Sequence, residues 1–193
     1  MNNKQKLLEE LYKQYKNCIN CPLGLTGRKN IVFGSGNPNS KLLIIGEAPG
    51  QQEDLQSKPF VGKAGKYLRL KLKEANINDF YVTNIVKCRP PNNRKPFRTE
   101  SAICKNIILY NQIKIIKPKI ICTLGVTALE ETTNKKWNFC TTRGSTLKIK
   151  NITIIPTYHP SYVARHIAKA EKEFIKDIKS LSDFLLVDNK PGG

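Results

Sequence analysis

Four short apolar segments alternate with helical patterns along this chain, and this alternation constrains the fold more than any other feature. The apolar segments are residues 41–46, 80–85, 119–124 and 152–157. Each has the length and the Ile, Leu and Val content of a buried strand. Helical patterns cover residues 4–16, 64–76, 99–116, 125–132 and 167–186, and Thr99 is expected to cap the third of these helices. Strands that alternate with helices predict a three-layer α/β/α fold around a central four-stranded, mainly parallel sheet.

The residues that follow each predicted strand are the first candidates for chemistry. In open parallel sheets, ligands bind beyond the carboxyl ends of the strands. The segments at this edge are 46–50, Asn84 with its successors, 125–127 and 159–161. Most of them carry polar, Gly or Pro residues that do not suit a core. We therefore expect the functional site at this edge.

The length of the chain, 193 residues, fits a single domain, which we predict to span residues 1–187 with a flexible tail at 188–193. No apolar run approaches the roughly 18 residues that a membrane-spanning helix needs. The first residues are polar and charged and lack the apolar stretch of a signal peptide. We therefore expect a monomer in the cytoplasm with no membrane partner.

The charge balance is strongly positive. Thirty-three Lys and Arg residues face fifteen Asp and Glu residues, which gives a net charge of +18. Such a surface attracts polyanions. Binding of nucleic acid is favoured further because its phosphates release their counterions when the protein neutralises them. A lysine-rich chain with no particular polyanionic partner remains the alternative reading of the composition.

Six cysteines are present: Cys18, Cys21, Cys88, Cys104, Cys122 and Cys140. Cys18 and Cys21 form a C-x2-C pair, and fifteen residues separate Cys88 from Cys104. Clustered cysteines in a cytosolic chain indicate a metal or catalysis rather than disulfides. Four thiolates can hold a zinc ion or an iron–sulfur cluster, and the single close pair favours the cluster because zinc ribbons usually have two. We interpret Cys122 and Cys140 as buried structural thiols.

Six motifs occur in order along the chain: GEAPGQQED at 46–54, PFVGKAG at 59–65, TNIVKCRPP at 83–91, LGVTA at 124–128, RG at 143–144 and HPSYVAR at 159–165. Together with the four cysteines, they resemble the family 4, iron–sulfur uracil-DNA glycosylases from about residue 7 to 180. Each motif alone would be weak, but six in the right order are specific. The resemblance implies a uracil-DNA glycosylase fold. It also implies a 4Fe–4S cluster on Cys18, Cys21, Cys88 and Cys104.

The resemblance also implies the roles of the residues that bind the base. A glycosylase flips its target nucleotide into a pocket. By resemblance, Phe60 stacks on uracil, Asn84 binds its N3–H and O4, and His159 bonds O2 and stabilises the leaving anion. Gly46, Ala48, Pro49 and Gly50 complete the substrate-binding set. Glu47 is expected to act in catalysis, by positioning water, steadying the cationic sugar or closing the pocket near uracil C5.

The expected partners are uracil-containing DNA and, in addition, replication or repair proteins. The DNA-binding candidates are Lys87, Arg89, Arg143, Ser161, Tyr162, Val163 and Arg165. The last four lie in a segment that resembles the DNA-intercalation loop of the family, where a side chain fills the space that the flipped base leaves. Tyr162, Val163 and Arg165 are equal candidates for this task.

Two other functions are consistent with parts of the sequence. The first is a binding module, which would bind nucleic acid through its basic surface without catalysis and use the cluster only for stability. The second is a hydrolase that is stabilised by zinc and acts on another small substrate. Strand cleavage by alkali at uracil, after incubation with the protein, separates an enzyme from a binding module. The colour of the protein separates an iron–sulfur cluster, which is brown, from zinc.

Overall fold

The computed structural model describes residues 3–165 and 167–187. The predicted tail, 188–193, lies outside the described residues. Six strands form one sheet in the order β1-β3-β2-β4-β6-β5. Their bounds are β1 Ser35–Gly36, β2 Leu42–Gly46, β3 Tyr81–Asn84, β4 Ile120–Leu124, β5 Leu147–Ile149 and β6 Ile152–Thr157.

The four predicted strands are confirmed as the parallel centre of this sheet. β2 pairs in parallel with both β3 and β4, and β4 pairs in parallel with β6. The sheet is wider than predicted, because β1 and β5 add short antiparallel edges on β3 and β6. These edges have only two and three residues, which is too short for a period-two pattern to be recognised.

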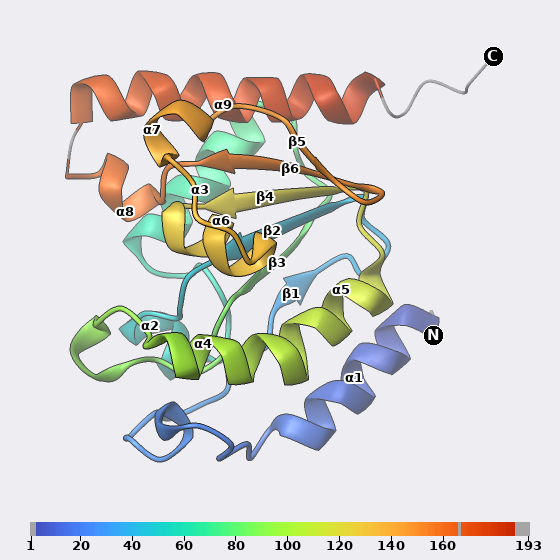
Figure 1. Cartoon of the computed structure of the whole chain (residues 1–193), viewed down its shortest axis with the longest axis vertical. Helices are drawn as coiled ribbons and strands as arrows, with labels where there is room; N and C mark the ends of the chain where they lie inside the picture. Colours follow the sequence, from blue (N-terminus) through green and yellow to red (C-terminus); the bar gives the residue numbers. More distant parts are fainter. Residues whose placement is uncertain (1–2, 166, 188–193) are drawn as a thin grey trace.

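Helices cover both faces of the sheet (Figure 1). On one face lie α1 (Asn3–Tyr15) and a continuous helical run made of α4 (Arg98–Cys104), a π-helical turn η3 (Lys105–Leu109) and α5 (Tyr110–Ile116). On the other face lie α3 (Lys63–Glu74) and α9 (Ile167–Val187). The predicted three-layer arrangement is therefore confirmed.

The start of α4 differs from the prediction that Thr99 caps it. The N-cap is Phe97, whose backbone N–H donates to the Glu100 carboxylate at 2.7 Å. Two guanidinium nitrogens of Arg94 donate to the same carboxylate, at 2.9 and 2.7 Å. Glu100 is fully buried, so this ion pair fixes the loop before α4 against the helix.

Alternate residues of the central strands form two apolar cores. Leu43 and Ile45 face α1 and the α4–α5 run, while Leu42 and Ile44 face α3 and α9. All five residues of β2 are buried, as expected for a central strand with helices on both sides. Both cores hold the strands in fixed register, and this fixes the positions at which their carboxyl ends stop.

Short helices occur in the segments that connect the strands. They are α2 (Gln51–Gln56), α6 (Val126–Thr133), α7 (Phe139–Thr142) and α8 (Pro160–Val163), and 3-10 turns occur at η1 (Pro22–Gly24) and η2 (Pro91–Asn93). Only α6 was predicted, because the other segments have too few residues for helical periodicity. In the described part of the chain, no helix has the length and apolarity needed to cross a membrane.

Candidate active site

A cavity of about 700 Å³ opens at the carboxyl edge of the sheet. Its lining includes residues that follow each of the four parallel strands: Glu47 after β2, Asn84 at the end of β3, Gly125 after β4 and His159 after β6. β3 and β4 lie on opposite sides of β2, so the chain changes direction across the sheet at this point. Such switch points are where open α/β sheets bind ligands. The position of the cavity therefore agrees with the prediction from strand order alone.

Asn84 and Phe60 line the cavity, and Gly46 lies directly against both side chains. A Cβ atom on Gly46 would lie 2.5 Å from Asn84 Oδ1 and 2.6 Å from Phe60 Cζ, so only glycine fits there. The Asn84 side chain is buried, and its Oδ1 has no hydrogen-bond partner among the described residues. An unsatisfied buried oxygen costs about 1–3 kcal/mol. At the wall of a cavity, such an oxygen is suited to accept a hydrogen bond from a ligand.

Phe60 is held in an unusual backbone conformation. Its φ is 56°, in the left-handed region that costs a bulky residue about 1–3 kcal/mol. The first turn of α3 packs directly on it, since a Cβ on Gly65 would overlap the Phe60 backbone. The ring is buried, lines the cavity, and lies 6.5 Å from the His159 ring with a tilt of 37°. The strained turn therefore presents an aromatic face beside the imidazole.

Glu53 fixes this turn and was not singled out from the sequence. Its Oε1 accepts hydrogen bonds from the Val61 N–H at 2.9 Å and the Gly62 N–H at 2.7 Å. The carboxylate also lines the cavity. Glu53 lies within the first motif, but nothing local in the sequence places it against a turn eight residues later.

His159 has a defined tautomer. The Ser161 backbone N–H donates to Nδ1 at 3.2 Å, and Ser161 Oγ lies 2.7 Å from the same nitrogen. Because Nδ1 accepts, the proton of the neutral ring is on Nε2. Burial first, and then the positive charge of Arg165, lower the pKa of His159, Glu53 opposes them, and the resulting value is about 4. At neutral pH the ring is therefore an uncharged donor through Nε2–H.

The predicted segment from Gly46 to Gly50 surrounds the same cavity. Glu47, Ala48, Pro49 and Gly50 line it, while Gly46 lies behind Asn84 and Phe60. The Glu47 carbonyl accepts a hydrogen bond from the Val86 N–H at 3.2 Å, which fixes the chain after β2. The Glu47 side chain is partly exposed at the cavity wall.

Three of the four predicted DNA-contacting residues around α8 lie at the mouth of the cavity. Ser161, Tyr162 and Arg165 line it, and Tyr162 stacks on Tyr158 with ring centroids 4.9 Å apart. Val163 is only 2% exposed and packs in the core beneath α3 and α9. The choice of Val163 as a DNA-contacting candidate is therefore wrong for this conformation of α8.

Two other predicted DNA contacts are directed into the protein. Lys87 is fully buried, so the prediction that it contacts phosphate is wrong. Arg143 donates to Asp177 at 2.6 Å and its guanidinium lies over the Tyr158 ring, 4.9 Å from the centroid. Arg143 therefore supports the aromatic pair at the cavity mouth rather than facing outward. Arg89 is partly exposed, donates to Asn93 Oδ1 at 2.8 Å, and stays a prediction.

The four candidate metal ligands lie together on the α1 side of the sheet. Cys21, Cys88 and Cys104 are buried in one apolar core, and Cys18 packs against this core. Each is electrostatically coupled to the others, and the N–H groups of Leu23 and Gly24 point at the Cys21 sulfur. Donors of this kind are typical of thiolate ligands in iron–sulfur proteins.

The burial of these cysteines and their coupling to one another are compatible with ligands of a bound metal group. Within residues 3–165 and 167–187, no three His, Cys, Asp or Glu side chains are placed so that they could hold a metal ion together. Burial raises the pKa of Cys88 to about 12 and that of Cys104 to about 11, so a bound cationic group is needed to hold them as thiolates.

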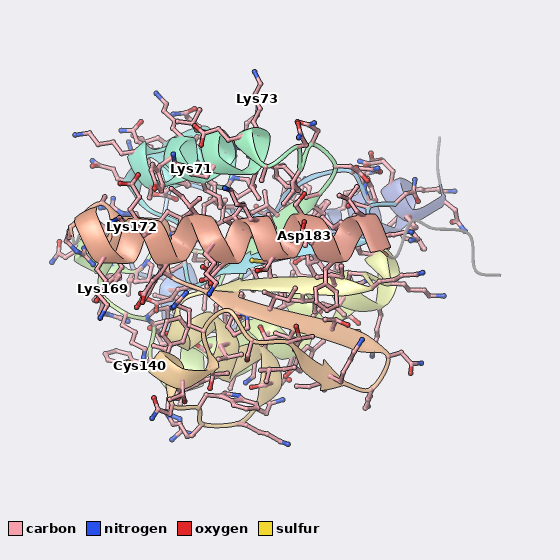
Figure 2. The ribbon with its side chains drawn as sticks, turned by 90° about the horizontal axis from the view of Figure 1, so that it is seen from above. Lys71, Lys73, Cys140, Lys169, Lys172 and Asp183 are labelled. Carbon is pink, nitrogen blue, oxygen red and sulfur yellow. The ribbon has the colours of Figure 1, made fainter. Side chains whose placement is uncertain are left out.

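The two remaining cysteines differ from each other. Cys122 is buried within β4, as predicted. Cys140 is exposed on α7 and lines the cavity, so the prediction that it is a buried thiol is wrong. Figure 2 places Cys140 at the same end of the molecule as Lys169, near the start of α9.

Comparison with known proteins identifies relatives over almost the whole chain. The model of the uracil DNA glycosylase superfamily matches residues 33–181. A type-4 uracil-DNA glycosylase of Thermotoga maritima is 39% identical over 190 residues, covering 96% of this chain and 98% of the relative. Type-4 enzymes of Sulfurisphaera tokodaii and Saccharolobus solfataricus are 38% and 41% identical, covering 91% and 80% of this chain and 84% and 76% of their own lengths.

Proposed function

The chain belongs to the uracil DNA glycosylase superfamily, as a type-4 uracil-DNA glycosylase, and from this premise we propose how its cavity binds uracil and releases it from DNA. The reaction is hydrolysis of the N-glycosidic bond between uracil and deoxyribose. The base leaves, water adds to the sugar carbon, and an abasic site remains in the strand.

The unsatisfied Asn84 Oδ1 is the observation that supports this assignment most strongly. Uracil in DNA has one N–H group, at N3, flanked by the carbonyl oxygens O2 and O4. Asn84 Oδ1 would accept from N3–H, and the amide NH₂ would donate to O4. Phe60 would stack on the base, in a slot whose depth depends on the missing side chain at Gly46.

His159 would stabilise the charge that develops on the base. When the C1′–N1 bond breaks, its electron pair moves to uracil and the negative charge spreads onto O2. A neutral His159 that donates through Nε2–H would bond this oxygen more strongly as its charge grows. Preorganised donors of this kind are worth about 2.7–4 kcal/mol each. The departed uracil anion then takes a proton from solvent.

Glu47 would act on the sugar side of the base. It follows directly on Gly46 and lines the cavity with a partly exposed carboxylate. A carboxylate there can balance the cationic character of the sugar in the transition state, or hold the attacking water. Glu53 would have a different task, because its carboxylate is occupied by the turn that presents Phe60.

The mouth of the cavity would receive the DNA strand. Tyr162 and Arg165 are the accessible candidates for the space left by the flipped nucleotide. The net charge of +18 supports attraction to the phosphates on either side, including contact by Arg89. We also place the protein in the cytoplasm as a monomer, with replication or repair proteins as further partners.

Cys18, Cys21, Cys88 and Cys104 would hold a 4Fe–4S cluster. When bound, such a cluster would link the segment after α1 covalently to the segment after β3 and to the last residue of α4. Its expected contribution is to stability, because none of the four cysteines lines the cavity.

A uracil-containing oligonucleotide, incubated with the protein and heated in alkali, tests the function. We expect strand breakage at uracil in single strands and in U·A and U·G duplexes. Asn84→Ala removes both hydrogen bonds to the base and should lower the single-turnover rate by about 2 kcal/mol or more, roughly thirtyfold. The matched control is Asn151→Ala. Asn151 is exposed and directly precedes β6, at the end of the strand away from the cavity, so this variant should cleave normally. Absence of breakage with the unaltered protein, or normal cleavage by Asn84→Ala, would contradict the proposal.

A further inference from the structure

Lys87 occupies an unexpected position between the cysteines and the base pocket. Its side chain is fully buried, although lysine is among the residues most rarely found inside proteins. The ammonium donates to Thr83 Oγ1 at 2.7 Å and to the backbone carbonyl of Asn84. Lys87 therefore lies directly behind the residue that recognises the base.

No carboxylate among the described residues pairs with Lys87. Lys105 gives the contrast, because it also adjoins a candidate ligand, Cys104, and is nearly buried. Its ammonium has a conventional partner, the Glu131 carboxylate at 2.7 Å. A buried ammonium without an opposite charge costs several kcal/mol. A charged Lys87 therefore needs a negative charge from another kind of group.

The cysteines are the groups in the right place. Burial lowers the pKa of Lys87 to about 7, and the nearby Cys104 and Cys88 oppose this by favouring the charged ammonium. The Lys87 backbone N–H also points at the Cys104 sulfur. Four thiolates around an iron–sulfur core leave the site with a net negative charge. The Lys87 ammonium thus bonds the Asn84 backbone and is also coupled to two of the cysteines, while the Arg28 guanidinium acts on Cys88 and donates to the Cys18 carbonyl at 3.0 Å.

The surrounding hydrogen bonds leave the end of β3 little freedom. Thr83 Oγ1, which accepts from Lys87, donates to the Phe33 carbonyl at 2.8 Å. The Gln112 amide donates to the same carbonyl at 2.9 Å. The side chains of Thr83, Lys87 and Gln112 are all buried. A change in the position of the Lys87 ammonium would therefore be transmitted to the Asn84 backbone.

We propose that Lys87 is a positioning residue that couples the two sites: its ammonium balances the charge of the cysteine-bound cluster and fixes the Asn84 backbone for uracil recognition. This inference rests on the proposed function, since it takes the cluster and the uracil pocket as given. It assigns the cluster an indirect influence on base binding, through one buried cation.

Two variants separate the charge of Lys87 from its hydrogen bonds. Lys87→Met removes both, while Lys87→Gln keeps a shorter donor without charge. The matched control replaces the neutral pair, Lys105→Met with Glu131→Gln, and leaves the net charge unchanged. For each brown, iron-loaded protein we would measure iron per chain, the reduction potential of the cluster by voltammetry, and the affinity for free uracil by calorimetry.

Loss of a nearby positive charge makes an added electron less favourable, so both Lys87 variants should shift the potential to more negative values. Lys87→Met should bind uracil at least tenfold more weakly, and Lys87→Gln should recover most of this loss. The control should match the unaltered protein in all three measurements.

An unchanged potential in Lys87→Gln, or unchanged uracil affinity in Lys87→Met, would overturn the inference. If Lys87→Met does not fold, Lys87→Gln decides the matter through its potential. If Lys87→Gln loses iron while its circular dichroism and the control remain normal, the role as counter-charge is supported. An unaltered protein without iron would overturn the coupling. An iron-loaded protein that leaves uracil in DNA would overturn the proposed function, and the potentials would then still test whether Lys87 balances the charge of the cluster.

Discussion

Replacement of His159 tests how the leaving base is stabilised. His159→Ala removes the Nε2–H donor, while Phe60 and Asn84 keep their own supports from Gly65 and the β3 end. One preorganised donor to a developing anion is worth about 2.7–4 kcal/mol, so single-turnover cleavage should slow by about 10² to 10³. Uracil-containing oligonucleotide under saturating protein, followed by alkaline cleavage, gives this rate directly.

A control at the other ring nitrogen makes this prediction specific. Ser161→Ala removes the hydroxyl near Nδ1, but the Ser161 backbone N–H still donates to that nitrogen and fixes the tautomer. This variant should therefore lose less than about tenfold. A His159→Ala rate within tenfold of the parent, or an equal loss in Ser161→Ala, would refute the assignment of His159 as the donor to O2.

The same histidine predicts a pH dependence of stability. Burial and Arg165 lower the folded-state pKa of His159 to about 4, and Glu53 partly opposes this; the unfolded value is near 6.5. Below pH 6.5, His159 is therefore protonated in the unfolded chain. In the folded protein the imidazole stays neutral until the pH falls to about 4. At about 1.36 kcal/mol per pH unit, the parent should lose about 2 kcal/mol between pH 7.5 and pH 5 relative to His159→Gln. Urea unfolding of both proteins at each pH measures the difference, and equal losses would contradict a buried neutral imidazole.

Four further perturbations test other parts of the account. Gly46→Ala would place its Cβ 2.5 Å from Asn84 Oδ1, so uracil release should fall at least a hundredfold while circular dichroism stays normal; near-parental rates would be contradictory. Glu53→Ala frees the turn at Phe60, so KM for uracil DNA should rise more than kcat falls, as steady-state kinetics would reveal. Cys88→Ala should lower the iron content measured by emission spectroscopy and cost about 2 kcal/mol or more in urea unfolding, and full iron loading would exclude Cys88 as a ligand. Arg143→Met leaves Asp177 buried without its cation and should destabilise the protein by about 3 kcal/mol in the same assay; an unchanged midpoint would show that the pair is not needed.

The central strands and the location of the site could be predicted from the sequence because both depend on strong local signals. Continuous Ile and Leu runs indicate strands that are covered on both faces, and strand ends in a parallel sheet meet at one edge. Asn84 ends β3 and His159 comes two residues after β6, so their convergence could be predicted without knowing the loop conformations. β1, β5 and α8 were missed because segments of two to four residues carry no usable period.

The errors at individual residues have a common physical origin in tertiary contacts. Lys87 was expected at the surface because lysine rarely tolerates burial, and only the fold brings Thr83 Oγ1, the Asn84 carbonyl and the cysteines around it. Val163 turns inward because one turn of α8 directs it at α3 and α9. The role of Glu53 depends on the left-handed backbone of Phe60, which no sequence pattern signals for a bulky residue.

The most direct test of the central claim is a crystal structure of the protein with uracil. The base should lie in the cavity at the carboxyl edge, stacked on Phe60, with N3–H within hydrogen-bond distance of Asn84 Oδ1 and O2 within hydrogen-bond distance of His159 Nε2. Uracil bound elsewhere, or bound in this cavity with its N3–H directed away from Asn84, would contradict the account.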